Sequence, residues 1–122
     1  MKKILFCLIC MLIVGAIDAM AALPKDATIY WTAPTTNGDG TPLTDLGGFK
    51  VYCGSSPGVY TVAKDVGNVS TYLISNDLPK DGVYYCAVTA YDVNGNESIL
   101  SNEVSFPLDR TAPAKVTGVG VR

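Results

Sequence analysis

The segment spanning residues 82–98, GVYYCAVTAYDVNGNES, constrains the fold more than any other part of this chain. Apolar and aromatic residues alternate along it in a period of two. Tyr84 and Cys86 fall on one face, and Tyr85 and Tyr91 fall on the other. A half-buried strand requires this alternation, which the 3.6-residue period of a helix does not produce. A turn centred on Gly95 follows, with Gly95 expected at positive φ. The segment therefore predicts a long strand of an antiparallel sheet.

The rest of the chain divides into shorter apolar segments between clusters of Gly, Pro, Asn and Asp. We expect strands at residues 27–32, 49–53, 70–75 and 100–106, with a short edge strand at 60–63 and Pro107 closing the last one. Ile29 and Trp31 are expected to face inward. The inner face of residues 70–75 stays open, because Tyr72 with Ile74 competes with Leu73. No segment has a sustained helical period, so the fold class is all-β.

The N-terminal residues have the features of an export signal. Lys2 and Lys3 precede an apolar run at residues 4–17, and small residues follow at 19–21. We expect a signal peptide at residues 1–21, one domain at 22–106 and a tail at 107–122. The run is shorter than the roughly 20 residues that span a bilayer, so an uncleaved anchor is the less favoured alternative. The expected location is secreted, periplasmic or at the cell surface.

Several residue patterns occur together in an order that is typical of one family. They are Trp31 on an early strand, the Phe49-x-Val51-Tyr52 strand, Leu78 six residues before Tyr84, and the run from residue 88 to residue 98. Over about residues 27–106 the chain resembles a bacterial fibronectin type III domain. The resemblance implies an immunoglobulin-like antiparallel β-sandwich. It also implies structural roles for Trp31 in the core and for Tyr84, whose hydroxyl would tie the preceding turn to the backbone.

Two regions depart from that family. Only residues 23–26 separate the expected cleavage site from the first predicted strand, so the family's first strand is short or absent, and the loop at 35–48 is long. Residues 109–115 resemble a linker between tandem repeats, and residues 116–121 resemble the opening strand of another repeat. The tail is therefore either part of a longer array or a strand that fills the vacant first position in its own domain or in a neighbouring molecule.

Two cysteines remain in the expected mature chain, Cys53 and Cys86. On the sandwich model they lie on neighbouring antiparallel strands, and both face inward. Opposed Cα atoms in such strands are about 4.5 to 5.5 Å apart, within disulfide range. Exported proteins usually oxidise such a pair. We expect a cross-strand disulfide worth roughly 3 to 4 kcal/mol, the alternative being two separate buried thiols.

Composition excludes several kinds of chemistry. The chain has no histidine, which removes Ser-His-Asp and Cys-His catalysis and the usual zinc sites. We expect no catalytic residue, no cofactor and no metal. Two loops, 37–40 with Asp45 and 92–97, hold clustered oxygen ligands, but a turn is the favoured interpretation of both over a calcium site. The expected mature chain is mildly acidic without a basic stripe, which argues against nucleic acid and anionic membranes.

Tyr52, Tyr85 and Tyr91 are predicted to gather on the outward face of the two central strands, with Lys50 among them. Such side chains suit protein contacts or stacking against sugar rings. The alternative is that they only stabilise the sheet as cross-strand pairs. The sequence thus favours a non-catalytic extracytoplasmic module for protein contact or spacing, whose alternative is a carbohydrate-binding accessory module. In the family that the chain resembles, such domains accompany adhesins and secreted polysaccharide-degrading enzymes, so the resemblance implies an extracytoplasmic protein or a polysaccharide as the partner.

Overall fold

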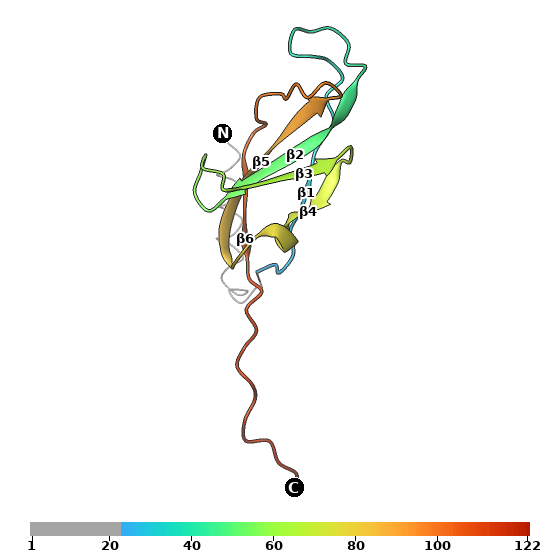
Figure 1. The fold of residues 1–122 in the computed structure, drawn as a ribbon. Coiled ribbons are helices and arrows are strands. Elements are labelled where there is room, and N and C mark those ends of the chain that lie inside the picture. Colours follow the sequence, from blue (N-terminus) through green and yellow to red (C-terminus); the bar gives the residue numbers. More distant parts are fainter. Residues whose placement is uncertain (1–22) are drawn as a thin grey trace, which may run out of the picture.

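In a computed structural model, residues 23–122 are described, and they form an all-β fold (Figure 1). The predicted signal peptide lies outside these residues. Two antiparallel sheets are present, one in the order β1-β4 and one in the order β3-β2-β5-β6. The elements are β1 (Thr28–Tyr30), β2 (Leu46–Gly54), β3 (Val62–Gly67), β4 (Thr71–Leu73), the 3₁₀ turn η1 (Ile74–Asp77), β5 (Gly82–Asp92) and β6 (Val104–Leu108). None of the helical structure within residues 23–122 is long and apolar enough to cross a membrane.

The two longest strands, β2 and β5, form the centre of the larger sheet. Their register places Val51 opposite Val88 and Cys53 opposite Cys86. These four side chains are buried in a core that also contains Ile29 of the smaller sheet. The predicted disulfide is confirmed: Cys53 and Cys86 are bonded, their Cα atoms 4.2 Å apart. Direct opposition in the register brings the two sulfurs together without any loop having to adapt.

The smaller sheet is held by very short strands and by packing. Ile29 on β1 pairs with Tyr72 on β4. Ile29 and Ile74 are buried, Tyr72 packs against the core, and Leu73 is 39% exposed. Tyr72 and Ile74 therefore take the inner face that the sequence left undecided. The predicted strand at 70–75 was too long, because the chain turns into η1 at Ile74.

Trp31, expected in the core, lies just after β1, where it is only partly buried and packs against the core. Its ring centroid lies 5.4 Å from that of Phe49. The Trp31 Nε1 atom is buried and has no hydrogen-bond partner among residues 23–122. A buried donor of this kind offsets part of the gain from burying the ring. The core as a whole consists of Ile29, Phe49, Val51, Cys53, Ile74, Leu78, Tyr84, Cys86, Val88 and Leu108.

Two strand predictions near the edges were wrong. The strand expected at 60–63 is β3, which begins at Val62 and continues to Gly67. The strand expected at 100–106 is β6, which runs from Val104 to Leu108 and includes Pro107. Proline is tolerated there because β6 is an edge strand, where an amide that would face outward is not needed by the sheet. Leu108, beyond the predicted strand end, is 2% exposed and belongs to the core.

The end of the domain nearest the C-terminus is fastened by polar contacts to backbone carbonyls. The Tyr84 hydroxyl donates to the carbonyl of Lys80 at 2.6 Å. The Arg110 guanidinium donates to the carbonyls of Ser75 at 2.8 Å and Leu78 at 2.9 Å. Beyond these anchors, residues 111–122 are exposed and lead away from the sheets (Figure 1). At the opposite end, Gly95 has a φ of 88° in the turn after β5.

Candidate binding face of the larger sheet

The outward face of β2 and β5 brings the three predicted tyrosines onto one surface. The register places Tyr52 opposite Ala87, Tyr85 opposite Gly54 and Tyr91 opposite Gly48. All three tyrosines are half-buried, and Ala87 beside them is buried. The expected row of freely exposed tyrosines is therefore replaced by a packed layer. Its rings cover the sheet and leave only part of each ring open to solvent.

Tyr91 is fixed by a glycine beneath it and a carboxylate beside it. A Cβ atom at Gly48 would lie 2.5 Å from the Tyr91 hydroxyl oxygen, so only glycine leaves room for this ring. The hydroxyl donates to Asp65 Oδ1 at 2.8 Å. This hydrogen bond is the main cause that lowers the pKa of the Asp65 carboxyl. The Lys50 ammonium lies 5.7 Å from the ring centroid, within cation–π range.

Glu97 joins the two strands at the centre of this face. Its carboxylate accepts hydrogen bonds from the Tyr52 hydroxyl and from Thr89 Oγ1, the latter at 2.6 Å. The Lys50 ammonium lies 3.5 Å from the same carboxylate. The hydrogen bond from Thr89, followed by that from Tyr52, lowers the pKa of Glu97. The bond to Glu97 in turn raises the pKa of Tyr52, so the proton stays on the phenol.

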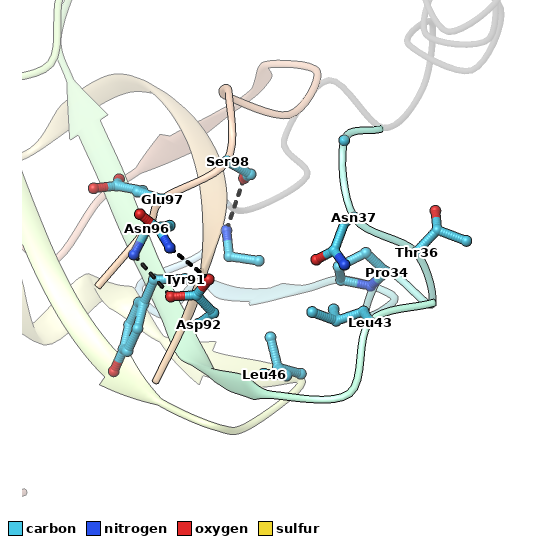
Figure 2. A pocket seen from close by; sticks show the side chains of 12 residues that line it. Pro34, Thr36, Asn37, Leu43, Leu46, Tyr91, Asp92, Asn96, Glu97 and Ser98 are labelled. Atoms are coloured by element: carbon cyan, nitrogen blue, oxygen red, sulfur yellow. Dashed lines mark hydrogen bonds between the residues drawn. The ribbon is translucent and has the colours of Figure 1, made fainter. Parts of the chain in front are cut away.

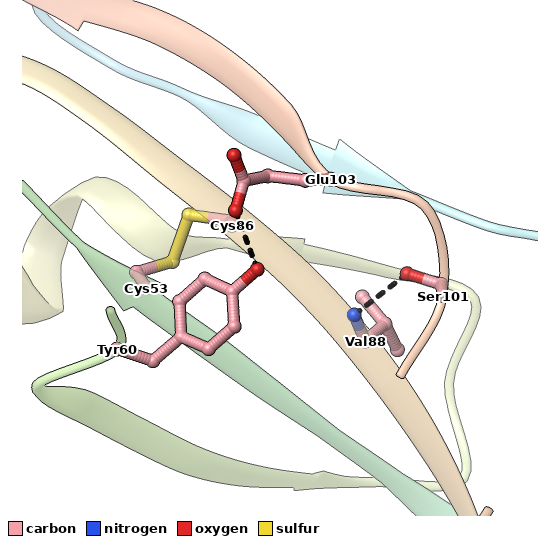
Figure 3. Close-up of a disulfide and its surroundings, with 6 residues drawn as sticks. All are labelled: Cys53, Tyr60, Cys86, Val88, Ser101 and Glu103. Atoms are coloured by element: carbon pink, nitrogen blue, oxygen red, sulfur yellow. Dashed lines mark hydrogen bonds between the residues drawn. A yellow bond between two sulfur atoms is a disulfide. The ribbon is translucent and has the colours of Figure 1, made fainter. Parts of the chain in front are cut away.

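Tyr60 and Glu103 extend the same arrangement beside the disulfide (Figure 3). Tyr60 donates to Glu103 Oε1 at 2.6 Å, and the amide of Gly58 donates to the same oxygen at 2.8 Å. The ring centroids of Tyr52 and Tyr60 are 6.3 Å apart. The hydrogen bond to Glu103 raises the pKa of Tyr60. Ser101 lies close by and accepts a hydrogen bond from the Val88 amide with its hydroxyl.

We call this surface the tyrosine–carboxylate face. Sequence reasoning found its three tyrosines on β2 and β5, and also Lys50, but missed the residues supplied by other segments. The face consists of Lys50, Tyr52, Tyr60, Asp65, Tyr85, Tyr91, Glu97 and Glu103. Tyr60 was interpreted as part of an edge strand and Glu97 as a turn residue. No local pattern signals these partners, since the paired residues Tyr60 and Glu103 are 43 positions apart.

The two acidic loops weighed as calcium sites are turns whose carboxylates bond to their own backbone. Asp39 Oδ1 accepts from the amide of Thr41 at 3.0 Å. Asp92 Oδ1 accepts from the amides of Asn94 and Asn96, both at 2.9 Å. Asp92 and Asn96 line a cavity of about 410 Å³ (Figure 2). Within residues 23–122, no three His, Cys, Asp or Glu side chains group as metal ligands would.

Comparisons with known proteins find no match: no family model, no curated protein and no solved structure is similar enough to this chain to identify it.

Proposed function

We propose that this chain is an exported, non-catalytic module of the fibronectin type III kind that binds another extracytoplasmic protein through its tyrosine–carboxylate face. The observation that carries the proposal is the fixed orientation of the rings. Tyr52, Tyr60 and Tyr91 each donate to a carboxylate from another segment of the chain. A ring held in place before binding loses little side-chain entropy when a partner covers it.

Several features of the fold support the family part of the proposal. A four-stranded sheet in the order β3-β2-β5-β6 shares one core with the β1-β4 pair. Trp31 packs on Phe49 across that core, and the Tyr84 hydroxyl is bonded to the backbone of Lys80. The resemblance implies a tryptophan at the core and a tyrosine hydroxyl bonded to the backbone before its strand, so both contacts support the proposal. The proposed family therefore accounts for the positions of Trp31 and Tyr84.

The charge of the face favours a basic partner. Asp65, Glu97 and Glu103 bring three carboxylates to it, against the single ammonium group of Lys50. A protein surface with Lys or Arg would meet opposite charge there, which steers association and selects orientation. A basic contact surface on the partner is therefore part of the proposal.

A polysaccharide fits this face less well than a protein does. Sugar rings stack on an open aromatic plane, whereas the rings of Tyr52, Tyr60, Tyr85 and Tyr91 are all half-buried. The Lys50 ammonium also lies over the ring of Tyr91. Protein contact is thus the function that the geometry supports best, and polysaccharide binding becomes an outcome of the test.

The disulfide and the N-terminal signal pattern support the location. A disulfide in a small domain persists in oxidising compartments, and Cys53 and Cys86 are bonded here. Export would place the tyrosine–carboxylate face outside the cytoplasm, in contact with other exported proteins. An intact mass of the exported protein measured without reduction tests cleavage after Ala21 and the disulfide together.

The binding proposal is tested by immobilising the oxidised protein and exposing it to extracytoplasmic proteins of its source cell and, separately, to insoluble polysaccharides. We expect the immobilised chain to retain a partner protein and to release it at high salt. Immobilised Tyr52→Ala should not retain that partner. Tyr30→Ala is the matched control, because Tyr30 is 80% exposed on β1, away from this face. Circular dichroism of each variant checks that it is folded.

Equal retention of the protein by wild type and Tyr52→Ala would remove the tyrosine–carboxylate face from the proposal. Retention on polysaccharide alone, lost in Tyr85→Ala, would establish the carbohydrate-binding alternative. Absence of any retained protein or polysaccharide would leave the chain as a spacer and overturn the binding role.

A further inference from the structure

The outer edge of β1 presents unpaired backbone groups. The carbonyl of Ala27 accepts from Ile74, and the amide of Trp31 donates to Ser70, so the peptide groups of these residues face β4. Peptide groups alternate in direction along a strand, which turns those of Thr28 and Tyr30 toward the opposite side. Within residues 23–122, no strand pairs with β1 on that side. β1 is therefore an open edge, able to accept a further strand.

A groove runs along this open edge. Residues 24 and 26–30 form one wall, and Asn102, Val104, Ser105 and Phe106 contribute to the other; the volume between them is about 550 Å³. A second hollow of about 350 Å³ shares Ile29, Tyr30, Asn102 and Val104 with the first and continues it toward Trp31. Tyr30 is 80% and Val104 43% exposed. The smaller sheet thus leaves an elongated, partly apolar groove beside an unpaired strand edge.

The tail of the same chain has the pattern of a strand that fits such a groove. Val116, Val119 and Val121 are 79 to 99% exposed in the described structure. In an extended conformation Val119 and Val121 point to one side, while Gly118 and Gly120 on the other side carry no side chain. The tail can therefore place two valines in a groove and bring its backbone close to an edge.

Charge favours the same pairing. Residues 23–108 carry four basic and nine acidic side chains, whereas residues 110–122 carry three basic side chains and no acidic one. Lys115 and Arg122 flank the tail valines, and Asp26 lines the groove. Attraction between a basic strand and an acidic acceptor raises the rate of encounter and selects this partner over a neutral one.

We propose that residues 116–122 of one molecule add as an antiparallel strand to the outer edge of β1 in a second copy of this chain. The proposal uses a surface separate from the tyrosine–carboxylate face and does not depend on the function proposed above. Main-chain hydrogen bonds to Thr28 and Tyr30 would supply affinity, and burial of Val119 and Val121 in the groove would fix the register.

A second copy is required because a molecule's own tail cannot enter its groove in this direction. The Asp109 amide bonds to the carbonyl of Pro24, and the Thr111 hydroxyl bonds to Asp81, so the tail leaves beside the Pro24 end. An antiparallel strand must enter at the Tyr30 end instead. The groove wall of residues 24–30 extends over roughly 23 Å, whereas the four residues 112–115 reach only about 14 Å.

The experiment is sedimentation velocity on the oxidised full chain, from low micromolar to near-millimolar concentration. We expect the weight-average mass of wild type to rise at least about twofold, since each molecule offers one donor and one acceptor on different surfaces. A donor variant, Val119→Asp with Val121→Asp, should stay monomeric. Val116→Asp is its matched control, because Val116 faces away from the groove in the docked strand, and it should still associate.

Two acceptor variants guard against a simple folding defect. Thr28→Pro removes an outward amide but no bond to β4, and Val104→Asp places a charge in the groove. Each should be monomeric alone and should melt like the donor variant. An equimolar mixture of the donor variant with either acceptor variant should form a one-to-one dimer that grows no further, because only one intact donor and one intact acceptor remain.

Monomeric wild type at every concentration overturns the proposal, as does a mixture of donor and acceptor variants that fails to pair. Monomeric wild type together with a lower melting temperature of the donor variant would assign the tail to its own groove. A synthetic peptide of residues 111–122 should bind the donor variant and not Val104→Asp, whereas binding to neither contradicts the pairing.

Discussion

The two sheets share one core but are held together in different ways. In the larger sheet, β2 and β5 are long strands joined by a ladder and by the Cys53–Cys86 bond. In the smaller sheet, β1 and β4 are three-residue strands that depend on Ile29 and Ile74 packing inward. The larger sheet therefore supplies a rigid face. The smaller sheet is kept in place mainly by the core beneath it, and its outer edge remains open.

The part of the fold that is most strongly stabilised and the strand edge that is free to bind a partner therefore lie on different sheets. A strand edge can accept a new partner only if the fold does not already pair it, and the outer edge of β1 is unpaired within residues 23–122. The tyrosine–carboxylate face instead depends on β2 and β5 being held in register, because Tyr52 and Glu97 come from different segments. The disulfide therefore lies beneath the tyrosine–carboxylate face, and the open edge of β1 lies on the smaller sheet.

Among the changes that test this difference between the sheets, removal of the disulfide should lower the free energy of unfolding most. Cys53→Ala with Cys86→Ala frees a loop of 33 residues, and the chain-entropy model gives a loss of roughly 3 to 4 kcal/mol in the free energy of unfolding. The measurement is urea denaturation followed by tryptophan fluorescence of Trp31. A reductant should destabilise wild type similarly and leave the double variant unchanged. An unaltered midpoint in the double variant would show that β2 and β5 do not need the bond.

Truncation of the buried side chain that closes the smaller sheet comes second. Ile74 has no exposed surface, so Ile74→Ala should cost about 2 to 4 kcal/mol through lost burial and a cavity. Ile99→Ala is the matched control at a position that is 90% exposed, and it should change stability by less than about 0.5 kcal/mol. Similar small losses for both variants, measured by the same denaturation, would contradict the view that packing holds this sheet.

Removal of a single hydroxyl at the start of β5 should have a smaller effect. Tyr84→Phe deletes the hydrogen bond to the Lys80 carbonyl and should cost about 1 kcal/mol. Tyr85→Phe removes the neighbouring hydroxyl, which makes no side-chain hydrogen bond within residues 23–122, and should be nearly neutral. Thermal melting of the two variants side by side distinguishes them, and equal melting temperatures would show that the Tyr84 bond contributes nothing.

The smallest expected effect is the change of stability with pH that arises from the tyrosine–carboxylate face. Hydrogen bonds lower the pKa of Asp65 and Glu97, so the folded state binds protons less readily than the unfolded state does. The stability that these two carboxylates contribute is present above about pH 4 and is lost as pH falls further. The raised pKa of Tyr52 acts oppositely, with stability lost as pH rises above about 10. Denaturation midpoints should therefore form a plateau between these limits.

Glu97→Gln should make the acid side of that plateau shallower, because one of the carboxylates that responds to acid has been removed. Asp26→Asn is the control, since the exposed Asp26 side chain takes part in no hydrogen bond or ion pair within residues 23–122. The midpoint is measured at each pH for wild type and both variants. An acid slope that Glu97→Gln leaves unchanged would remove Glu97 from the pH response.

The fold was predictable where a pattern within one strand decides the outcome. Alternation along residues 82–91 gave the position of β5 and placed Cys86 on its inner face, from which the bond to Cys53 followed. The end of β6 was missed because Pro107 is compatible with an edge strand, and nothing local shows that this strand is at an edge. Tyr60 was assigned to a short edge strand, whereas β3 begins at Val62.

The candidate site was predictable only in part, for the same reason. Alternation places Tyr52, Tyr85 and Tyr91 on one face, but their exposure depends on what lies against them. Glu97 and Glu103 reach the face from segments that follow β5, and the spacing of these residues shows no period. Side-chain pairing between distant segments is a property of the packed chain. The sequence therefore could not show that the predicted row of exposed tyrosines is a half-buried layer held by carboxylates.

The position of the disulfide also determines how this domain responds to a mechanical load. When the chain is pulled from both sides, the segment between Cys53 and Cys86, with a sequence separation of 33, cannot extend while the bond is intact. At about 3.6 Å per residue, this withholds roughly 12 nm of contour length. Under tension the oxidised domain is therefore a short, stiff extension element, and reduction turns it into a longer one.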